Sequence, residues 1–175
     1  MGAEWYQTVD YKWWRGRDIY HYRHDRQGKG CKRCICIYCG KGRRGIQLRQ
    51  EGKEDGVVIV GDGSGSVVKV TSSFVTLKNL RITHSGDRHD KLDGAISLEN
   101  VKHCEINTVH IDDCLFGIDF QNTSNSKIIN NYITSKDSSI GLRGDGIRLW
   151  YSNDNLIENN TLYKSRDIVV WYSHN

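Results

Sequence analysis

Residues 57–175 carry a pattern of apolar and polar positions that repeats four times. Each repeat opens with a six-residue segment that is apolar at its first and last positions and apolar or Asn at its fourth; these segments are 77–82, 106–111, 128–133 and 157–162. A shorter segment follows each of them and alternates with a period of two, as a half-buried β-strand does. The shorter segments are 95–98, 117–120, 146–149 and 167–170.

The spacing of the repeats predicts a coil. The six-residue segments begin 29, 22 and 29 residues apart. A unit of that length cannot bury its apolar side alone, whereas stacked units bury one continuous column. We therefore expect an all-β chain that forms a parallel β-helix of about four rungs, in which each strand pairs with its equivalent one rung away. A sandwich would need hairpin turns between adjacent strands, and the repeat favours coiling instead.

Two asparagines stand at a normally apolar position of the repeat. Asn131 and Asn160 occupy the place that Leu80 and Val109 hold in the earlier repeats. Side chains stacked in register can hydrogen-bond along a ladder, which allows an amide to be buried. The alternative is that both face solvent in turns. Two cysteines, Cys104 and Cys114, flank the second repeat, where we expect them to be small buried hydrophobes.

The connections between paired segments alternate in length. From the last apolar residue of one segment to the first isoleucine of the next, the distance is 14, 7, 14 and 6 residues. The first and third repeats therefore carry an insertion at the same corner, in residues 84–93 and 135–145. Insertions in repeat proteins gather on one face, which is often the binding face. We expect the two loops to lean across the short second repeat, so that the His and Asp residues within 84–93 lie near Asp112, Asp113 and Asp145.

The corner loops supply the candidate site residues. An imidazole and carboxylate set that could hold a divalent ion consists of His84, Asp87, His89, Asp90 and Asp93. A candidate partner or ligand face consists of Asp113, Arg143 and Asp145. Imidazole and oxygen ligands suit Cu(II), whereas Cu(I) prefers sulfur, and Met1 is the single methionine. No residue is assigned a catalytic role from the sequence.

Several short runs in this region resemble the NosD family. They are Gly61–Ser66, Asn79–Ile82, Leu92–Gly94, Gly117–Ile118, Gly144–Trp150 and Arg166–Ser173. The resemblance covers about residues 56–175, and the long–short–long order of the rungs is its most specific part. Family members have more rungs and an export signal, so the resemblance implies a truncated or fragmentary member.

The resemblance implies a right-handed parallel β-helix of the pectin-lyase-like class that is located in the periplasm. It also implies a copper-binding accessory protein that helps to assemble the copper–sulfur centre of nitrous oxide reductase together with an ABC transporter. The alternative is a β-helix that binds carbohydrate, or one that acts on uronans as a polysaccharide lyase or epimerase. Such chemistry needs a base for the C5 proton and a cation to neutralise the carboxylate. Arg88, Lys91 and Arg143 could neutralise it, but aromatic residues that line a groove are not evident.

The first third of the chain differs from the rest. Residues 1–56 contain 13 Lys and Arg against 7 Asp and Glu, whereas residues 57–175 contain 12 against 14. We therefore divide the chain into an irregular segment, 1–56, and a β-helix domain, 57–175. The interleaved basic and aromatic residues of the first segment would suit nucleic acid, but a segment not native to the fold, from a shifted frame or misassigned start, is the favoured interpretation.

The first segment also contains a cysteine cluster, Cys31, Cys34, Cys36 and Cys39. Structural zinc sites separate their two cysteine pairs by a dozen or more residues, whereas a single residue separates these pairs. The spacing therefore does not favour zinc, although a cluster site or incidental metal binding by thiolates stays open. No apolar run approaches the roughly 20 residues of a membrane helix, and no signal peptide is visible.

Overall fold

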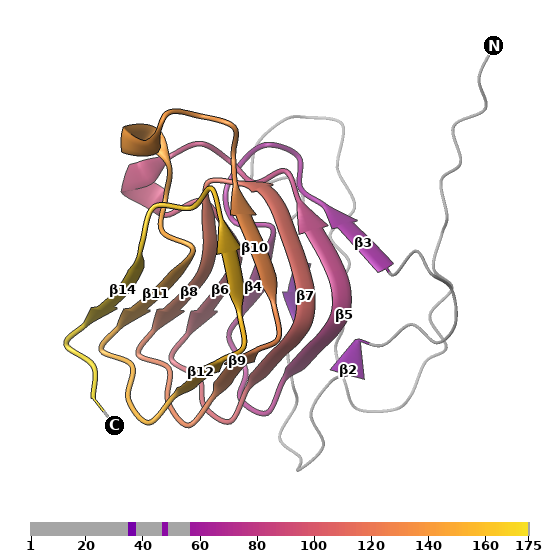
Figure 1. The fold of residues 1–175 in the computed structure, drawn as a ribbon. Helices are drawn as coiled ribbons and strands as arrows, with labels where there is room; N and C mark the ends of the chain where they lie inside the picture. Colours follow the sequence, from indigo (N-terminus) through magenta and orange to yellow (C-terminus); the bar gives the residue numbers. More distant parts are fainter. Residues whose placement is uncertain (1–34, 38–46, 49–56, 175) are drawn as a thin grey trace.

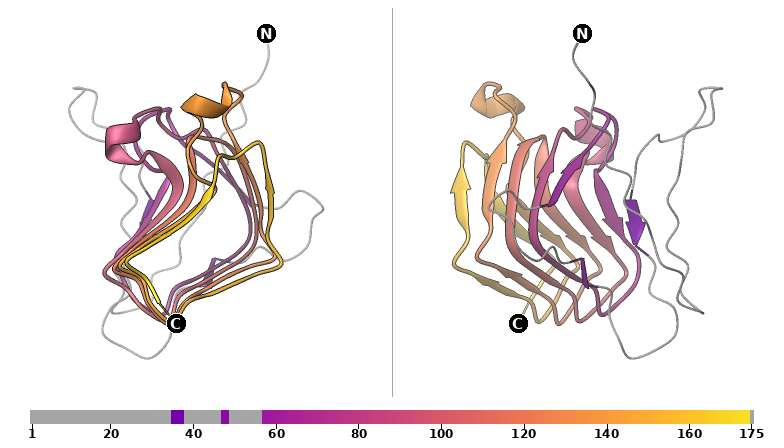
Figure 2. Two further views of the ribbon diagram at one scale, coloured as in Figure 1. Left: turned by 60° about the vertical axis from the view of Figure 1, so that its left-hand side comes forward. Right: turned by 90° about the vertical axis from the view of Figure 1, so that its right-hand side faces the viewer.

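The computed structural model describes residues 35–37, 47–48 and 57–174, and the side chains of 58–174. Over these residues the chain winds into a stack of coils, in which every strand pairing between elements is parallel (Figure 1). Two long sheets form opposite walls of the stack, and short corners join them (Figure 2). The predicted parallel β-helix is confirmed.

One wall is a six-stranded sheet with the order β1-β4-β6-β8-β11-β14. One or two strands of the other wall separate each strand in sequence from its neighbour, which is why the pairing is parallel. The strands are β1 (Ile35–Ile37), β4 (Val68–Val70), β6 (Gly94–Glu99), β8 (Phe116–Gln121), β11 (Ile147–Trp150) and β14 (Ile168–Trp171).

The other wall is an eight-stranded sheet in which long and short strands share the same coil positions. Its central path is β12-β9-β7-β10-β13, and β5 pairs with β7, β2 and β3. The strands are β2 (Gln47–Leu48), β3 (Val57–Val60), β5 (Thr76–Thr83), β7 (Glu105–Cys114), β9 (Lys127–Ile129), β10 (Tyr132–Ser135), β12 (Leu156–Glu158) and β13 (Thr161–Tyr163).

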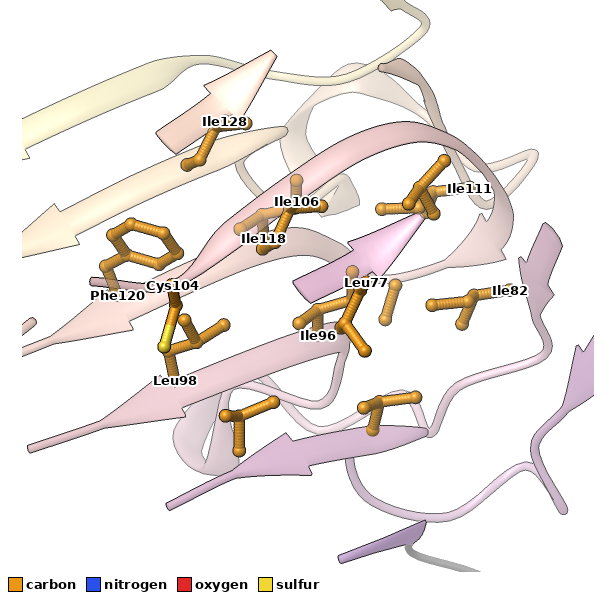
Figure 3. Packing of buried hydrophobic residues seen from close by; sticks show 14 of the residues in the cluster. Leu77, Ile82, Ile96, Leu98, Cys104, Ile106, Ile111, Ile118, Phe120 and Ile128 are labelled. Atoms are coloured by element: carbon orange, nitrogen blue, oxygen red, sulfur yellow. The ribbon is translucent and has the colours of Figure 1, made fainter. Parts of the chain in front are cut away.

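The core consists of apolar columns that run the length of the stack. One column comprises Ile82, Ile111, Ile133 and Leu162, which pair in register across four strands. The facing column comprises the buried Ile96, Ile118 and Ile147, and Ile168, which is exposed, pairs in register with Ile147. Figure 3 shows side chains of both walls pointing into the same interior. Since each coil buries its apolar side against the next, the four-fold pattern of the sequence becomes one continuous core.

Asparagines turn the chain at a corner between the walls. Asn100 and Asn122 have φ values of 54° and 49°, in the left-handed region that Asn tolerates better than most residues. They stack one rung apart, and the Asn122 side-chain amide donates a 2.8 Å hydrogen bond to the Asn100 side-chain oxygen. The corner is therefore held by the same side chains that permit its backbone conformation.

The two cysteines of the second repeat are buried, as predicted. Cys104 is 3% exposed and Cys114 is 0% exposed, and neither forms a disulfide. Burial raises the pKa of the Cys114 thiol to about 12. Both side chains therefore pack as small apolar groups.

Two short strands of the first third pair with the walls, β1 with β4 and β2 with β5. The cysteine cluster Cys31–Cys39 falls outside the described side chains, so its metal binding stays a prediction, as does the division of the chain at residue 56. No described helix is long and apolar enough to span a membrane.

Candidate functional site

The two predicted corner loops meet each other, as the spacing indicated. Each contains one turn of 3-10 helix, η1 (His89–Lys91) and η2 (Ile140–Leu142), and both project beyond the same corner of the stack (Figure 1). The His89 ring nitrogen Nε2 lies 3.1 Å from the Leu142 carbonyl oxygen. The ring also packs edge-on against Phe116, with 5.6 Å between the centroids. The contact joins the loops across the short rung between them.

A second group of loop residues forms a charged network. His84 Nδ1 lies 2.7 Å from a carboxylate oxygen of Asp113. The Lys136 ammonium is 2.9 Å from Asp87 and 3.8 Å from Asp113. The predicted proximity of His84 and Asp87 to Asp113 is therefore found. Lys136, which the sequence analysis did not single out, supplies the positive charge that pairs with Asp87 and Asp113.

The remaining candidate residues have separate structural partners. Asp90 pairs with Arg88 at 2.8 Å, and Asp93 is buried and accepts a hydrogen bond from the Arg88 backbone N–H. Asp145 is buried and bound by Arg166 at 2.8 Å. Other members lie apart: Asp112 pairs with Arg81, and Arg143 donates to the Ser138 carbonyl oxygen.

These partners argue against a copper centre at the corner. Over the described residues, no group of three or more His, Cys, Asp or Glu side chains is arranged to hold a metal ion. His84 and His89 are directed to different partners, Asp113 and Leu142. Among the described residues, the five side chains predicted as ligands are therefore not gathered into one group, and copper binding stays a prediction.

A different site lies on the outer face of the six-stranded sheet, where the polar positions of the strands stack in rows. The first row contains Lys69, Ser97, Asp119, Arg148 and Val169. The second row contains Glu99, Gln121, Trp150 and Trp171. In β4, β6, β8 and β11 these side chains alternate with buried core residues, so they point away from the core, and the side chains of β14 continue the same rows. In the sequence, the residues of the first row other than Lys69 stand at the third position of the shorter segments. The residues of the second row follow directly after these segments.

A cleft of about 550 Å³ opens over the β4, β6 and β8 part of this face. The loops 63–66 and 87–93 form its sides, and Lys69, Ser97, Glu99, Asp119 and Gln121 line its floor. Lys69 and Glu99 pair at 2.6 Å across neighbouring strands. Arg88 and Lys91 of the corner loop also line the cleft, whereas Arg143 is absent from its lining.

Asp119 is an acid held out of water at the boundary of the cleft. Its side chain is 3% exposed, and its pKa is raised because burial disfavours the charged form. One carboxyl oxygen accepts a 2.6 Å hydrogen bond from the Gln121 amide. The other lies 3.7 Å from Arg148 and has no hydrogen-bond partner among the described residues. A buried carboxyl with an unused oxygen at the edge of a cleft marks a candidate functional group.

Aromatic side chains continue the same face beyond Arg148. The Trp150 ring lies edge-on to Trp171 and Tyr172, with centroids 5.3 and 5.2 Å away. Tyr151 stacks on Tyr172 at 4.8 Å. Trp171 is 53% exposed and Tyr172 is 66% exposed. We call these four residues the aromatic platform. No described aromatic residue lines the cleft itself, in agreement with the sequence expectation, and the aromatic platform lies beyond it on the exposed part of the face, where strand pairing gathers residues about 20 positions apart in the sequence.

Residues 56–175 match the model of a family described as right handed beta helix region. The chain belongs to this family. No curated protein matches it, and no solved structure does. The family description indicates that the coil is right-handed, and it agrees with the parallel strand pairing in both sheets. It describes the fold, which hosts different functions in different proteins, so the function must be argued from the outer face itself.

Proposed function

We propose that this β-helix binds an extended glycan along the outer face of its six-stranded sheet. One observation carries the proposal: the polar cleft, the Asp119–Arg148 pair and the aromatic platform follow one another across successive strands. Binding sites typically combine apolar or aromatic surface with a few placed polar groups, and this face has both.

The shape of the face suits a long ligand. Parallel strands repeat every 4.7–4.9 Å or so, and a chain that crosses them meets equivalent positions at each step. Hydroxyl groups of a glycan can bond to the polar residues of the cleft, such as Gln121 and Ser97. The apolar face of a sugar ring can pack against the exposed indole of Trp171.

Affinity electrophoresis tests the proposal directly. The full chain is run through gels that contain polygalacturonate, dextran or dextran sulfate, and we expect at least one glycan to retard it. Trp171→Ala should weaken that binding about tenfold or more, because it removes the exposed part of the platform. The matched control is Tyr163→Ala, which removes an aromatic residue of similar exposure, 56%, from the opposite wall. The absence of retardation by all three glycans would contradict the proposal.

A second candidate function, cleavage of the bound glycan, rests on Asp119. In a β-elimination, a base takes the C5 proton of a uronate, the C4–O bond breaks and a C4–C5 double bond forms. The leaving oxygen takes up a proton, and a cation offsets the charge on the carboxylate. Asp119 in its carboxylate form would take the C5 proton, water would supply the proton to the leaving oxygen, and Arg88 and Lys91, which line the same cleft, would offset the charge on the carboxylate. Absorbance of unsaturated uronate products tests this activity, which Asp119→Asn should abolish.

The finer expectation from the NosD resemblance, a copper-binding accessory role toward nitrous oxide reductase and an ABC transporter in the periplasm, stays a prediction. The placement of His84 and His89 does not favour copper at the corner loops. Titration of the chain with Cu(II), compared with a variant in which both histidines are changed to Ala, tests metal binding separately from glycan binding.

A further inference from the structure

The most unusual polar group of the described structure is the Arg148 guanidinium. It carries five N–H donors, yet it makes no hydrogen bond to any described residue. Its contact with Asp119, at 3.7 Å between Nη1 and Oδ1, is too long for a hydrogen bond. The Arg148 side chain is only 13% exposed, so solvent reaches little of it. Buried donors are normally satisfied, and one that is not calls for an explanation.

The surroundings of Arg148 place this donor beside the aromatic platform. The guanidinium carbon lies 5.3 Å from the Trp150 ring centroid and 5.9 Å from that of Trp171. Cation–π contacts hold the group in place without using its hydrogen-bonding capacity in full. A sugar ring that packs on Trp171 would therefore present its substituents to Arg148.

The chemistry of the guanidinium selects the kind of substituent. Its planar fork matches carboxylate and sulfate oxygens in a bidentate arrangement, and such charge-assisted bonds are stronger than those to a neutral hydroxyl. We propose that Arg148 binds an anionic substituent, a carboxylate or a sulfate ester, of the saccharide unit that packs against Trp171. This inference rests on the proposed glycan binding and names the class of glycan.

Asp119 affects how strongly Arg148 attracts an anion. The groups that act on Asp119 are Arg148 and the hydrogen-bonding Gln121, together with the carboxylates of Glu99 and Asp145. Burial makes Asp119 easier to protonate. When it is protonated, it no longer offsets the charge on Arg148. Binding of the anionic glycan should therefore strengthen as the pH falls, until the glycan itself takes up protons.

Two matched pairs of glycans test the proposal on the full chain. Polygalacturonate is compared with its methyl ester, and dextran sulfate with dextran, since each pair differs in charge at nearly constant sugar structure. Wild type should bind the charged member of one pair about tenfold more tightly than the neutral member. The pair that shows this preference identifies the anion as carboxylate or sulfate.

Substitution of Arg148 separates this site from general attraction of polyanions to a chain of net charge +4. Arg148→Gln should bring the two affinities of the responsive pair close to equal, because it lowers the affinity for the charged member more than the affinity for the neutral one. Arg81→Gln is the control, because it removes the same charge from an arginine that is 51% exposed on the opposite wall. It should keep the preference.

The outcomes distinguish this inference from the proposed function. Equal binding of charged and neutral glycans by wild type, or the same effect of Arg148→Gln and Arg81→Gln, would overturn the role of Arg148 and leave glycan binding intact. A lack of binding to every glycan would remove both. Circular dichroism checks the fold of each variant. If Arg148→Gln does not fold, Arg148→Lys, which keeps the charge but loses the fork, should retain only part of the preference, and full retention would overturn the inference.

Discussion

Asn160 lies directly beside Asn131 in the next rung, and its side-chain oxygen accepts two hydrogen bonds from Asn131. The backbone N–H and the side-chain amide of Asn131 donate them, at 3.0 and 2.9 Å. Asn131 in turn accepts from the Val109 backbone N–H at 2.9 Å. The ladder predicted from the repeat is confirmed, and its alternative, two solvent-facing turns, was wrong for the buried Asn131.

We expect Asn131→Leu to destabilise the fold, although Leu80 occupies the same column two rungs earlier. The substitution removes the side-chain partner of the Val109 N–H and of the Ile106 carbonyl, and it removes one of the two hydrogen bonds that the Asn160 side-chain oxygen accepts. Unsatisfied buried groups cost about 1–3 kcal/mol each. Urea unfolding measures the loss, and Thr161→Ala, an exposed change in β13, is the control. An unchanged midpoint for Asn131→Leu would show that the ladder contributes little.

Gly117 and Gly141 should respond in opposite ways to the same substitution. A methyl group at Gly117 would overlap the Gly146 carbonyl oxygen and the Ile133 side chain, whereas at Gly141 it meets nothing within 4 Å. We expect Gly117→Ala to cost about 1–3 kcal/mol of unfolding free energy or more. Gly141→Ala should be close to neutral. Thermal unfolding of the two variants provides the comparison, and equal midpoints would mean that the coils can separate at little cost.

Asp119 should make the stability of the protein depend on pH. Its pKa is raised by burial above the usual 3.8, so the folded state keeps its proton after the unfolded state has lost it. Stability must then fall as the pH rises from the unfolded pKa toward the folded one. The Asn side chain of Asp119→Asn does not titrate. The stability of this variant relative to wild type should therefore be higher at about pH 7 than at about pH 4.5.

Asp90 provides a control of opposite sign. Its hydrogen bond with Arg88 lowers its pKa, so its contribution to stability is lost only below the unfolded pKa of 3.8. Asp90→Asn should therefore show a constant difference from wild type over the same range. Urea unfolding at both pH values measures both variants. A pH-independent difference for Asp119→Asn would mean that the Asp119 pKa is not raised.

His89 should couple the two corner loops. Removal of its ring in His89→Ala breaks the contact with the Leu142 carbonyl and the packing on Phe116. We expect several-fold faster amide exchange in residues 137–143, because the His89 contact restrains the far end of the loop, whereas the ion pairs of Lys136 and Asp137 restrain its start. His103→Ala, an exposed histidine that stacks on Phe74, is the control. Hydrogen-exchange mass spectrometry reports both, and equal protection of the loop in wild type and His89→Ala would contradict the coupling.

The sequence by itself determined the coil, the register of its apolar columns and the corner where the loops project. Each depends on a local period, since an apolar residue that recurs at the same position of every rung has one place to be buried. The pairing of His84 with Asp113 was accessible for the same reason, because loop lengths place both at one corner.

Only the tertiary structure decided where the outer face carries chemistry. Asp119, Arg148 and Trp171 are unremarkable within their own short strands, and their juxtaposition depends on which strands become neighbours. Burial of Asp119, and the lack of a hydrogen-bond partner for Arg148 Nη1 among the described residues, are likewise properties of the packed face. The repeat specifies which side chains point inward, because the interior excludes water in every rung. Side chains that point outward acquire a role only from the neighbours beside which the stacked strands place them.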